Sequence, residues 1–304
     1  MKMQNVARFE VANQLSHQVR DLVLRIFDDC PGQSEYRYVS RLDELDFGDV
    51  AKIFRERYAG CAALHVTNLP QFESVQQSKI LALLLGDAIG KCVAYSDYNQ
   101  SYITDIRPTN FSREASSGST LLRPHSDLAF ADPDSRPRDL VLVPHKAEGD
   151  QVKTLITPAN LLDAELSPED KAILREPIFE VVSGMKLAWK HLRITRLALL
   201  SDVGDRVHIR YDLSGLTPAR DLDESKKVMA TRAIASLEEI ALKLGREYGI
   251  AVSKGESLFI ANDLCLHGRA ELDPARSQRL LLRAYVVGES VVKAHHNRMI
   301  SLGH

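Results

Sequence analysis

Cysteine is scarce in this chain, and its four copies are widely spread. Cys30, Cys61, Cys92 and Cys265 form no Cys-x-x-Cys pair. This spacing argues against a disulfide framework and against a zinc site built from thiolates. Long apolar runs are also missing. The longest, such as residues 80–85, are far shorter than a membrane span requires.

A large excess of charge of either sign is absent as well. The net charge is -2 over 304 residues, and Lys and Arg are spread along the chain without a basic arm or stripe. Nucleic acid is therefore a poor candidate partner. Residues 1–10 are polar and lack the apolar core of a signal peptide. Since 44% of residues are hydrophobic and 26% charged, the composition predicts a soluble, cytoplasmic protein.

No repeat, low-complexity tract or linker divides the chain, so we expect a single domain over residues 1–304. Apolar residues recur at helical spacing in residues 15–27, 74–89 and 223–248. After residue 91 the pattern changes to short β-like runs punctuated by Pro, Gly, Asp or Asn. The predicted strands are residues 92–95, 102–106, 139–143, 152–157, 178–182, 207–211, 257–260 and 280–287. An α+β fold is expected, with a mainly β sandwich or barrel, a helical cover over about residues 1–90 and an inserted helix near 223–248.

The motif His125-Ser126-Asp127 carries the clearest chemical content. In an extended segment, residues two apart point to the same side, so an imidazole and a carboxylate can reach one ion. These donors suit iron(II), manganese or zinc. The motif alone is weakly specific, because the chain contains ten histidines. The alternative is a surface turn in which Asp127 caps a backbone N–H.

His267 and Arg279 strengthen the metal interpretation. His267 follows the apolar segment 257–260, so a ligand near a strand end could join the first pair. Arg279 opens the apolar run 280–282, and a guanidinium at the mouth of a buried strand needs an anion. It can grip the distal carboxylate of a dicarboxylic acid bound to the metal. Two histidines and one carboxylate form a facial triad, which leaves three iron positions for a co-substrate and O2.

Other residues receive simpler interpretations. His145 is the competing third ligand, but it begins a Pro-His-Lys loop without an arginine-led strand behind it. His191 and His208 are expected to be structural. Trp189 and Cys265 are expected to be packing residues. The small-residue stretch 108–120 predicts either a plain connector or a lid that closes over the site.

Two segments resemble the clavaminate synthase-like branch of the 2-oxoglutarate-dependent oxygenases, a superfamily that also contains taurine dioxygenase-like enzymes. The branch includes asparagine and arginine β-hydroxylases. Residues 118–130, GSTLLRPHSDLAF, are similar to its first metal segment, in which Glu often replaces Asp127. Residues 279–286, RLLLRAYV, are similar to its closing strand. The resemblance covers about residues 102–287 and implies a double-stranded β-helix (jelly-roll) core over about residues 91–290.

The resemblance also implies roles for single residues. His125, Asp127 and His267 would hold Fe(II), and Arg279 and Thr154 would bind 2-oxoglutarate; an ordinary strand threonine is the alternative for Thr154.

Two further residues would contact the substrate. Arg283, four residues beyond Arg279, faces the same side of an extended strand and can reach the same cavity. Asp212 matches a segment that approaches the substrate and could hold an amino or guanidinium group. Aspartate also commonly ends strands, which is its alternative interpretation.

The implied reaction converts 2-oxoglutarate and O2 to succinate and CO2 while a substrate carbon is hydroxylated. Related halogenases have Ala or Gly in place of the carboxylate ligand, so Asp127 argues against halogenation. We expect a dioxygenase that hydroxylates a small molecule, a free amino acid or a derivative, in natural-product (specialised) metabolism, with carrier tethering left open. Desaturation, cyclisation or epoxidation by the same chemistry, a zinc hydrolase, and a non-catalytic jelly-roll binding protein are the alternatives.

Overall fold

The computed structural model describes residues 4–30, 34–108, 119–147, 152–183, 191–273, 277–295 and 298–302. Over these residues the chain has a mixed α+β fold with several sheets. Trp189 and most of the predicted lid, residues 109–118, lie outside the described residues. No helix in the described ranges has the length and apolar character that crossing a bilayer demands.

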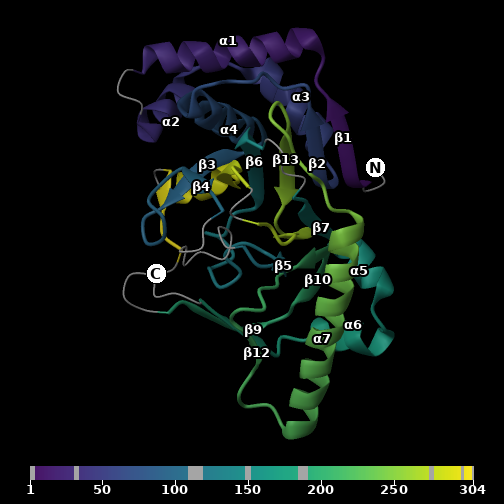
Figure 1. The fold of residues 1–304 in the computed structure, drawn as a ribbon. Coiled ribbons are helices and arrows are strands. Elements are labelled where there is room, and N and C mark those ends of the chain that lie inside the picture. Colours follow the sequence, from purple (N-terminus) through teal and green to yellow (C-terminus); the bar gives the residue numbers. More distant parts are fainter. Residues whose placement is uncertain are drawn as a thin grey trace.

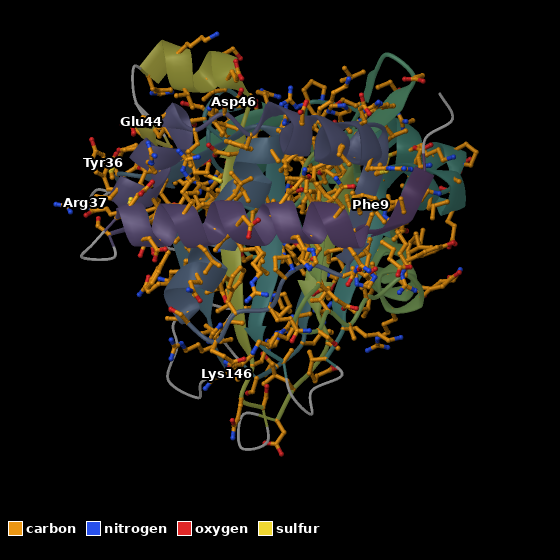
Figure 2. The ribbon with its side chains drawn as sticks, turned by 90° about the horizontal axis from the view of Figure 1, so that it is seen from above. Phe9, Tyr36, Arg37, Glu44, Asp46 and Lys146 are labelled. Atoms are coloured by element: carbon orange, nitrogen blue, oxygen red, sulfur yellow. The ribbon has the colours of Figure 1, made fainter. Side chains whose placement is uncertain are left out.

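Four helices lie on one side of the largest sheet (Figure 1). They are α1 Asn13–Asp29, α2 Glu35–Glu44, α3 Gly48–Tyr58 and α4 Val75–Ile89. Helix α4 is almost entirely buried and packs on the sheet, and the Ser74 side chain caps its first turn by accepting from the backbone N–H of Gln76 at 3.3 Å. Helix α1 forms the outer layer. Seen from above it runs from the Phe9 end of the molecule to the Tyr36 end (Figure 2).

The largest sheet combines strands from both ends of the chain. Its order is β1 Gln4–Glu10, β2 Cys61–Thr67, β13 Ser257–Ala261, β6 Asp139–Lys146, β15 Leu280–Val287, β3 Lys91–Tyr95 and β16 Met299–Ile300, and β4 Ile103–Ile106 also pairs with β15. The predicted helical cover over residues 1–90 is therefore incomplete, because this segment also contains β1 and β2, which join the sheet.

The two faces of β15 have different neighbours. A Cβ atom added to Gly86 of α4 would lie 3.1 Å from Val286 Cγ2 and 3.8 Å from Ala284 Cβ, so these side chains face the helices. Side chains alternate along a strand. Arg283 and Tyr285 therefore face away from the helical layer, toward the smaller sheets.

Three smaller sheets and four more helices complete the described chain. The strand orders are β5 Leu122–His125, β14 Cys265–Arg269, β7 Thr154–Pro158; then β12 Leu216–Pro218, β8 Phe179–Val182, β9 Arg193–Leu197; and β10 Leu200–Val203 with β11 Arg206–Ile209. The helices are α5 Ala159–Glu165, α6 Pro168–Leu174, α7 Glu224–Glu247 and α8 Glu289–His295.

Helix α7 covers one face of the β5–β14–β7 sheet. Thr157 Oγ1 donates to the Ala241 carbonyl oxygen at 2.7 Å. A Cβ on Gly245 would lie only 3.1 Å from that hydroxyl, so the glycine permits a close approach. The bounds of α7 differ from the predicted 223–248 by one residue at each end. With this face covered, the opposite face of the sheet is left for other contacts.

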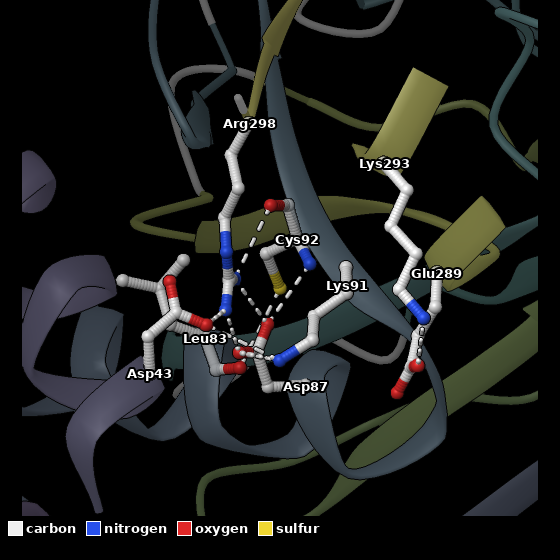
Figure 3. A network of polar contacts seen from close by, with 8 residues as sticks. All are labelled: Asp43, Leu83, Asp87, Lys91, Cys92, Glu289, Lys293 and Arg298. Carbon is white, nitrogen blue, oxygen red and sulfur yellow. Dashed lines mark hydrogen bonds and ion pairs between the residues drawn. The ribbon is translucent and has the colours of Figure 1, made fainter. Parts of the chain in front are cut away.

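A buried ionic network fixes the C-terminal strand to the helical layer (Figure 3). Arg298 donates to both carboxylate oxygens of Asp87, at 2.8 and 2.7 Å, and also contacts Asp43. The Asp87 side chain is fully buried, and the backbone N–H of Cys92 donates to it at 2.9 Å. Loss of one partner from such a pair leaves an uncompensated buried charge.

We expect Asp87→Asn to lower the free energy of unfolding by about 3–5 kcal/mol, because the Arg298 guanidinium loses its buried counter-charge. Urea denaturation measures this change. The control is Glu289→Gln, which breaks the exposed Glu289–Lys293 pair in α8. That variant should change stability by less than about 1 kcal/mol. Equal losses in the two variants would contradict a special role for the buried pair.

Candidate metal centre

Strand pairing brings the two predicted histidine ligands together. In the antiparallel β14–β5 pair, His267 lies directly opposite His125. Opposite residues project from the same face of a sheet. Their ring centroids are accordingly 4.6 Å apart. A Cβ on Gly268 would collide with the Leu122 carbonyl oxygen, so a glycine is needed for this close approach of the strands.

Asp127 completes a three-residue group just after β5. Its Oδ1 lies 3.4 Å from His125 Nε2, and its Oδ2 lies 3.5 Å from His267 Nε2. One ligand atom from each residue falls within 4.8 Å of the others. A search of the described ranges for three or more His, Cys, Asp or Glu side chains that could share a metal ion finds these three residues.

The backbone around Asp127 is fixed by Asn262, a residue that no sequence motif marks as functional. Asn262 Oδ1 accepts from the Asp127 N–H at 2.8 Å, and its Nδ2 donates to the Asp127 carbonyl oxygen at 3.0 Å. Leu128 then adopts a φ of +54°, which is unusual for this residue type. Asn262 is fully buried directly after strand β13, which only the folded structure shows, so the sequence carried no local signal for it.

The carboxylate of Asp127 is held in its charged form. Arg283 Nη1 donates to Oδ2 at 3.0 Å, and the guanidinium stacks 4.6 Å from the Tyr285 ring centroid. Burial by itself raises the pKa of Asp127. The charges of Arg283 and His267, with hydrogen bonds from both imidazoles, outweigh burial and hold that pKa well below its usual range. An ionised carboxylate is the form that binds a cation.

The two imidazoles are tuned differently. Burial favours the neutral form of both, but contact with Asp127 and the charge of Asp212 raise the pKa of His125. At His267, burial prevails over the attraction of Asp127 and lowers the pKa. His125 Nδ1 lies 2.9 Å from the Arg123 carbonyl oxygen, which can only accept. When His125 is protonated, Nε2 can donate to Asp127; when it is neutral, the proton stays on Nδ1 and the Nε2 lone pair is available to a metal ion.

A cavity of about 520 Å³ is lined by His125 and Asp127 of the three-residue group. Arg283 and Asp212 contribute charged side chains to its wall. Asp212 Oδ1 accepts from Ser214 N–H at 3.0 Å and from Ser214 Oγ at 2.7 Å. Much of the remaining lining is apolar and includes Leu121, Leu122, Pro124, Leu128, Phe130 and Leu213. Arg123 also lines the cavity, but its side chain pairs with Glu238. The cavity thus combines the charges of Arg283 and Asp212 with an apolar wall beside the candidate ligands.

Arg279 and Thr154 lie near the same sheets but outside the described lining of this cavity. Arg279 directly precedes β15 and is buried. Thr154 is buried opposite Arg269 in the β7–β14 pair, two residues along from the Ile156–His267 pair. Because side chains alternate, Thr154 and His267 share a face of this sheet. Contacts and the shared cavity lining therefore bring together His125, Asp127, His267, Arg283 and Asp212. Arg279 and Thr154 lie near this group, without a described contact to it.

The remaining histidine and cysteine predictions have mixed outcomes. His145 does not begin a loop: it lies within β6, buried, with Nδ1 2.9 Å from Ser78 Oγ, and it is not part of the three-residue group. His191 Nδ1 lies 2.7 Å from the Ser183 carbonyl oxygen. His208 lies in β11. Cys265 is fully buried, and burial raises the pKa of its thiol to about 12, as suits a packing residue.

Comparison with known proteins finds similarity at the level of structure. No family model matches the chain, and no curated protein matches it in sequence. Asparagine oxygenase, solved with Fe(II), 2S,3S-3-hydroxyasparagine and succinate, is 18% identical with a TM-score of 0.77, covering 98% of this chain and 99% of that one. The non-heme iron oxygenase OrfP, solved with Fe, succinate and (3S)-hydroxy-L-Arg, is 18% identical with a TM-score of 0.72, covering 97% and 99%.

A second OrfP structure, with Fe and alpha-ketoglutaric acid, has a TM-score of 0.71 at 18% identity and covers 97% of this chain and 100% of that one. These structural similarities extend over nearly the whole length of the chains compared. They include the first hundred residues, where the sequence carried no motif. The resemblance predicted from two short segments is thus confirmed: the chain has the fold of the non-heme iron oxygenases represented by asparagine oxygenase and OrfP.

Proposed function

We propose that this chain is an Fe(II)- and 2-oxoglutarate-dependent dioxygenase that hydroxylates a free amino acid or a close derivative. The observation that carries the proposal is the convergence of His125, Asp127 and His267, with ligand atoms within 4.8 Å of one another, beside a cavity with a cation and an anion in its wall. We propose further that the sheets form a jelly-roll core within a single domain.

The donor set fits iron(II), because two imidazole nitrogens and one carboxylate oxygen leave positions open on an octahedral ion. When bound, the ion would supply the activation of O2 that is coupled to conversion of 2-oxoglutarate to succinate and CO2. The chain's own residues prepare this site. Arg123 orients His125 through its carbonyl oxygen, Arg283 keeps Asp127 ionised, and Asn262 fixes the Asp127 backbone.

Two charged residues in the cavity wall support an amino-acid substrate. Arg283 has several N–H donors, so it can hold Asp127 and also bind a substrate carboxylate. Asp212 can bind an ammonium or guanidinium group, and its orientation is set by Ser214. The apolar lining, including Leu128 and Phe130, would limit water at the reacting carbon. Asparagine oxygenase and OrfP, with amino-acid ligands in their solved structures, support the same substrate class.

The metal assignment predicts that His125→Ala and His267→Ala each abolish tight iron binding. Anaerobic addition of Fe(II) and 2-oxoglutarate to the unaltered chain should give a weak visible charge-transfer band, and both variants should lack it. His17→Ala, on the exposed surface of α1, is the matched control and should retain the band. Succinate formation should require both 2-oxoglutarate and O2. Turnover that survives strict anaerobiosis would instead favour a hydrolase.

We also propose that Arg279 anchors the distal carboxylate of 2-oxoglutarate and that Thr154 donates a hydrogen bond to it. Arg279→Met should weaken 2-oxoglutarate binding about 10- to 100-fold, since hydrogen bonds to charged groups contribute about 1.5–3 kcal/mol. Titration of the visible band measures this affinity. Thr154→Val should have a smaller effect in the same direction. Arg220→Met, at an exposed position, should have none; an unchanged affinity in Arg279→Met would remove Arg279 from the site.

The substrate assignment predicts a selective effect of Asp212→Asn. Loss of the carboxylate should raise KM for the amino-acid substrate about 10- to 100-fold, while iron and 2-oxoglutarate affinities stay near their original values. A screen of amino acids for succinate release supplies the substrate. The control is Asp202→Asn, which removes a mostly exposed carboxylate paired with Arg175. Turnover restricted to compounds without amine and carboxylate groups would contradict the amino-acid assignment.

A further inference from the structure

A second cavity lies apart from the candidate metal centre. It has a volume of about 260 Å³ and lies among residues 133–136, strands β10 and β11, and Asp263. Its described lining shares no residue with the cavity beside His125. Four of its lining side chains can donate hydrogen bonds: Arg136, Ser201, His208 and Arg210. The cavity is therefore polar and rich in donors.

Arg136 has unused hydrogen-bonding capacity inside the protein. Only 7% of its side chain is exposed, and its Nη2 contacts the carboxylate of Asp263. Its Nη1 is buried and has no hydrogen-bond partner in the described structure. Buried guanidinium donors are normally satisfied, because an unmade hydrogen bond in the interior is costly. An oxygen atom of a ligand in the cavity would satisfy this donor.

Arg210 adds a second positive charge that no contacting carboxylate neutralises among the described residues. Its Nε donates to the Ala129 carbonyl oxygen at 2.7 Å, and its Nη2 donates to that of Ala131. Burial, followed by repulsion from Arg210, lowers the pKa of Arg136 to about 9. Burial, opposed by the attraction of Asp132, lowers the pKa of Arg210 to about 10. Among the lining residues, two guanidiniums face the single carboxylate of Asp263, and Asp132 attracts Arg210 from outside the lining, so the cavity wall itself carries an excess positive charge.

We propose that this cavity binds a small oxyanion, such as inorganic phosphate or a short carboxylate, through Arg136 and Arg210. Guanidinium groups match the geometry of both anion classes. The volume suits an anion of this size and is too small for a nucleotide. The bound charge would relieve the repulsion between the two arginines and supply an acceptor for Arg136 Nη1.

The site has a structural connection to the candidate metal centre. Arg210 holds the turn at Ala129 and Ala131, which follows Asp127 directly. Asp263 follows Asn262, which brackets the Asp127 backbone. An anion between Arg136 and Arg210 would thus stabilise two segments that position Asp127. The proposal does not depend on which reaction the metal centre performs.

Thermal unfolding of the full chain tests the proposal. The Tm is compared in potassium phosphate, sulfate, acetate and chloride at equal ionic strength. The order of the Tm shifts separates tetrahedral anions from carboxylates. A phosphate concentration about 100 times Kd should raise Tm by about 2–5 °C, with a saturable dependence on concentration. Phosphate and sulfate also stabilise proteins without binding, so the site-specific part is the difference between the chain and its variants.

Arg136→Met should remove the saturable Tm shift. The control is Arg175→Gln, which should retain it, because Arg175 forms surface pairs with Asp163 and Asp202.

Ser201→Asp gives an independent test if Arg136→Met does not fold. A carboxylate in the cavity wall should compete with phosphate and weaken its binding at least about 10-fold. Arg283→Met, in the other cavity, should retain the shift. The proposal would be overturned if phosphate raised Tm no more than chloride does, or if the saturable Tm shift persisted in Ser201→Asp.

Discussion

The site depends on a buried carboxylate, Asp127, that is kept ionised. A charge in this position requires partners, because its transfer from water is costly unless opposite charges and hydrogen bonds compensate. The partners come from separate parts of the fold: His125 from β5, His267 from β14 and Arg283 from β15 of the large sheet. The carboxylate therefore links two sheets, and the position of each sheet matters for the geometry around it.

Alternation along strands explains why these partners converge. The pairing of β14 with β5 places both imidazoles on one face, while α7 covers the other face through Thr157. On β15, Ala284 and Val286 face α4, and Arg283 therefore faces Asp127. A shift of either strand by one residue would turn its functional side chain toward a helix. Register is thus as important to the site as the identity of the residues.

Part of this arrangement could be predicted from the sequence. Helices α1, α4 and α7 were predicted within about two residues at each end, because each has a clear apolar face or an apolar run. The three candidate ligands were predicted from residue type and from resemblance to a known motif. Their pairing was not, because the sequence does not show that β14 lies between β5 and β7.

Other features had no local signal. Strand β2 is buried along almost its whole length, so it lacks the alternating pattern that identifies a strand with one exposed face. His145 was expected in a loop because it follows a proline, yet it extends β6 at a bulge opposite Leu280 and Leu281. Asn262 acts through hydrogen bonds to backbone 135 positions away, and such contacts depend on tertiary structure alone.

Charge balance connects the candidate ligands with the proposed substrates. Asp127 and Arg283 neutralise each other in the chain as it stands. A divalent cation bound there would add two positive charges, which the two carboxylates of 2-oxoglutarate would cancel. Asp212 and Arg279 again carry opposite charges, and an amino acid brings an ammonium and a carboxylate that also cancel. Since a buried site tolerates little net charge, this set of side chains suits a divalent ion, a dicarboxylate and a zwitterion together better than any one of them alone.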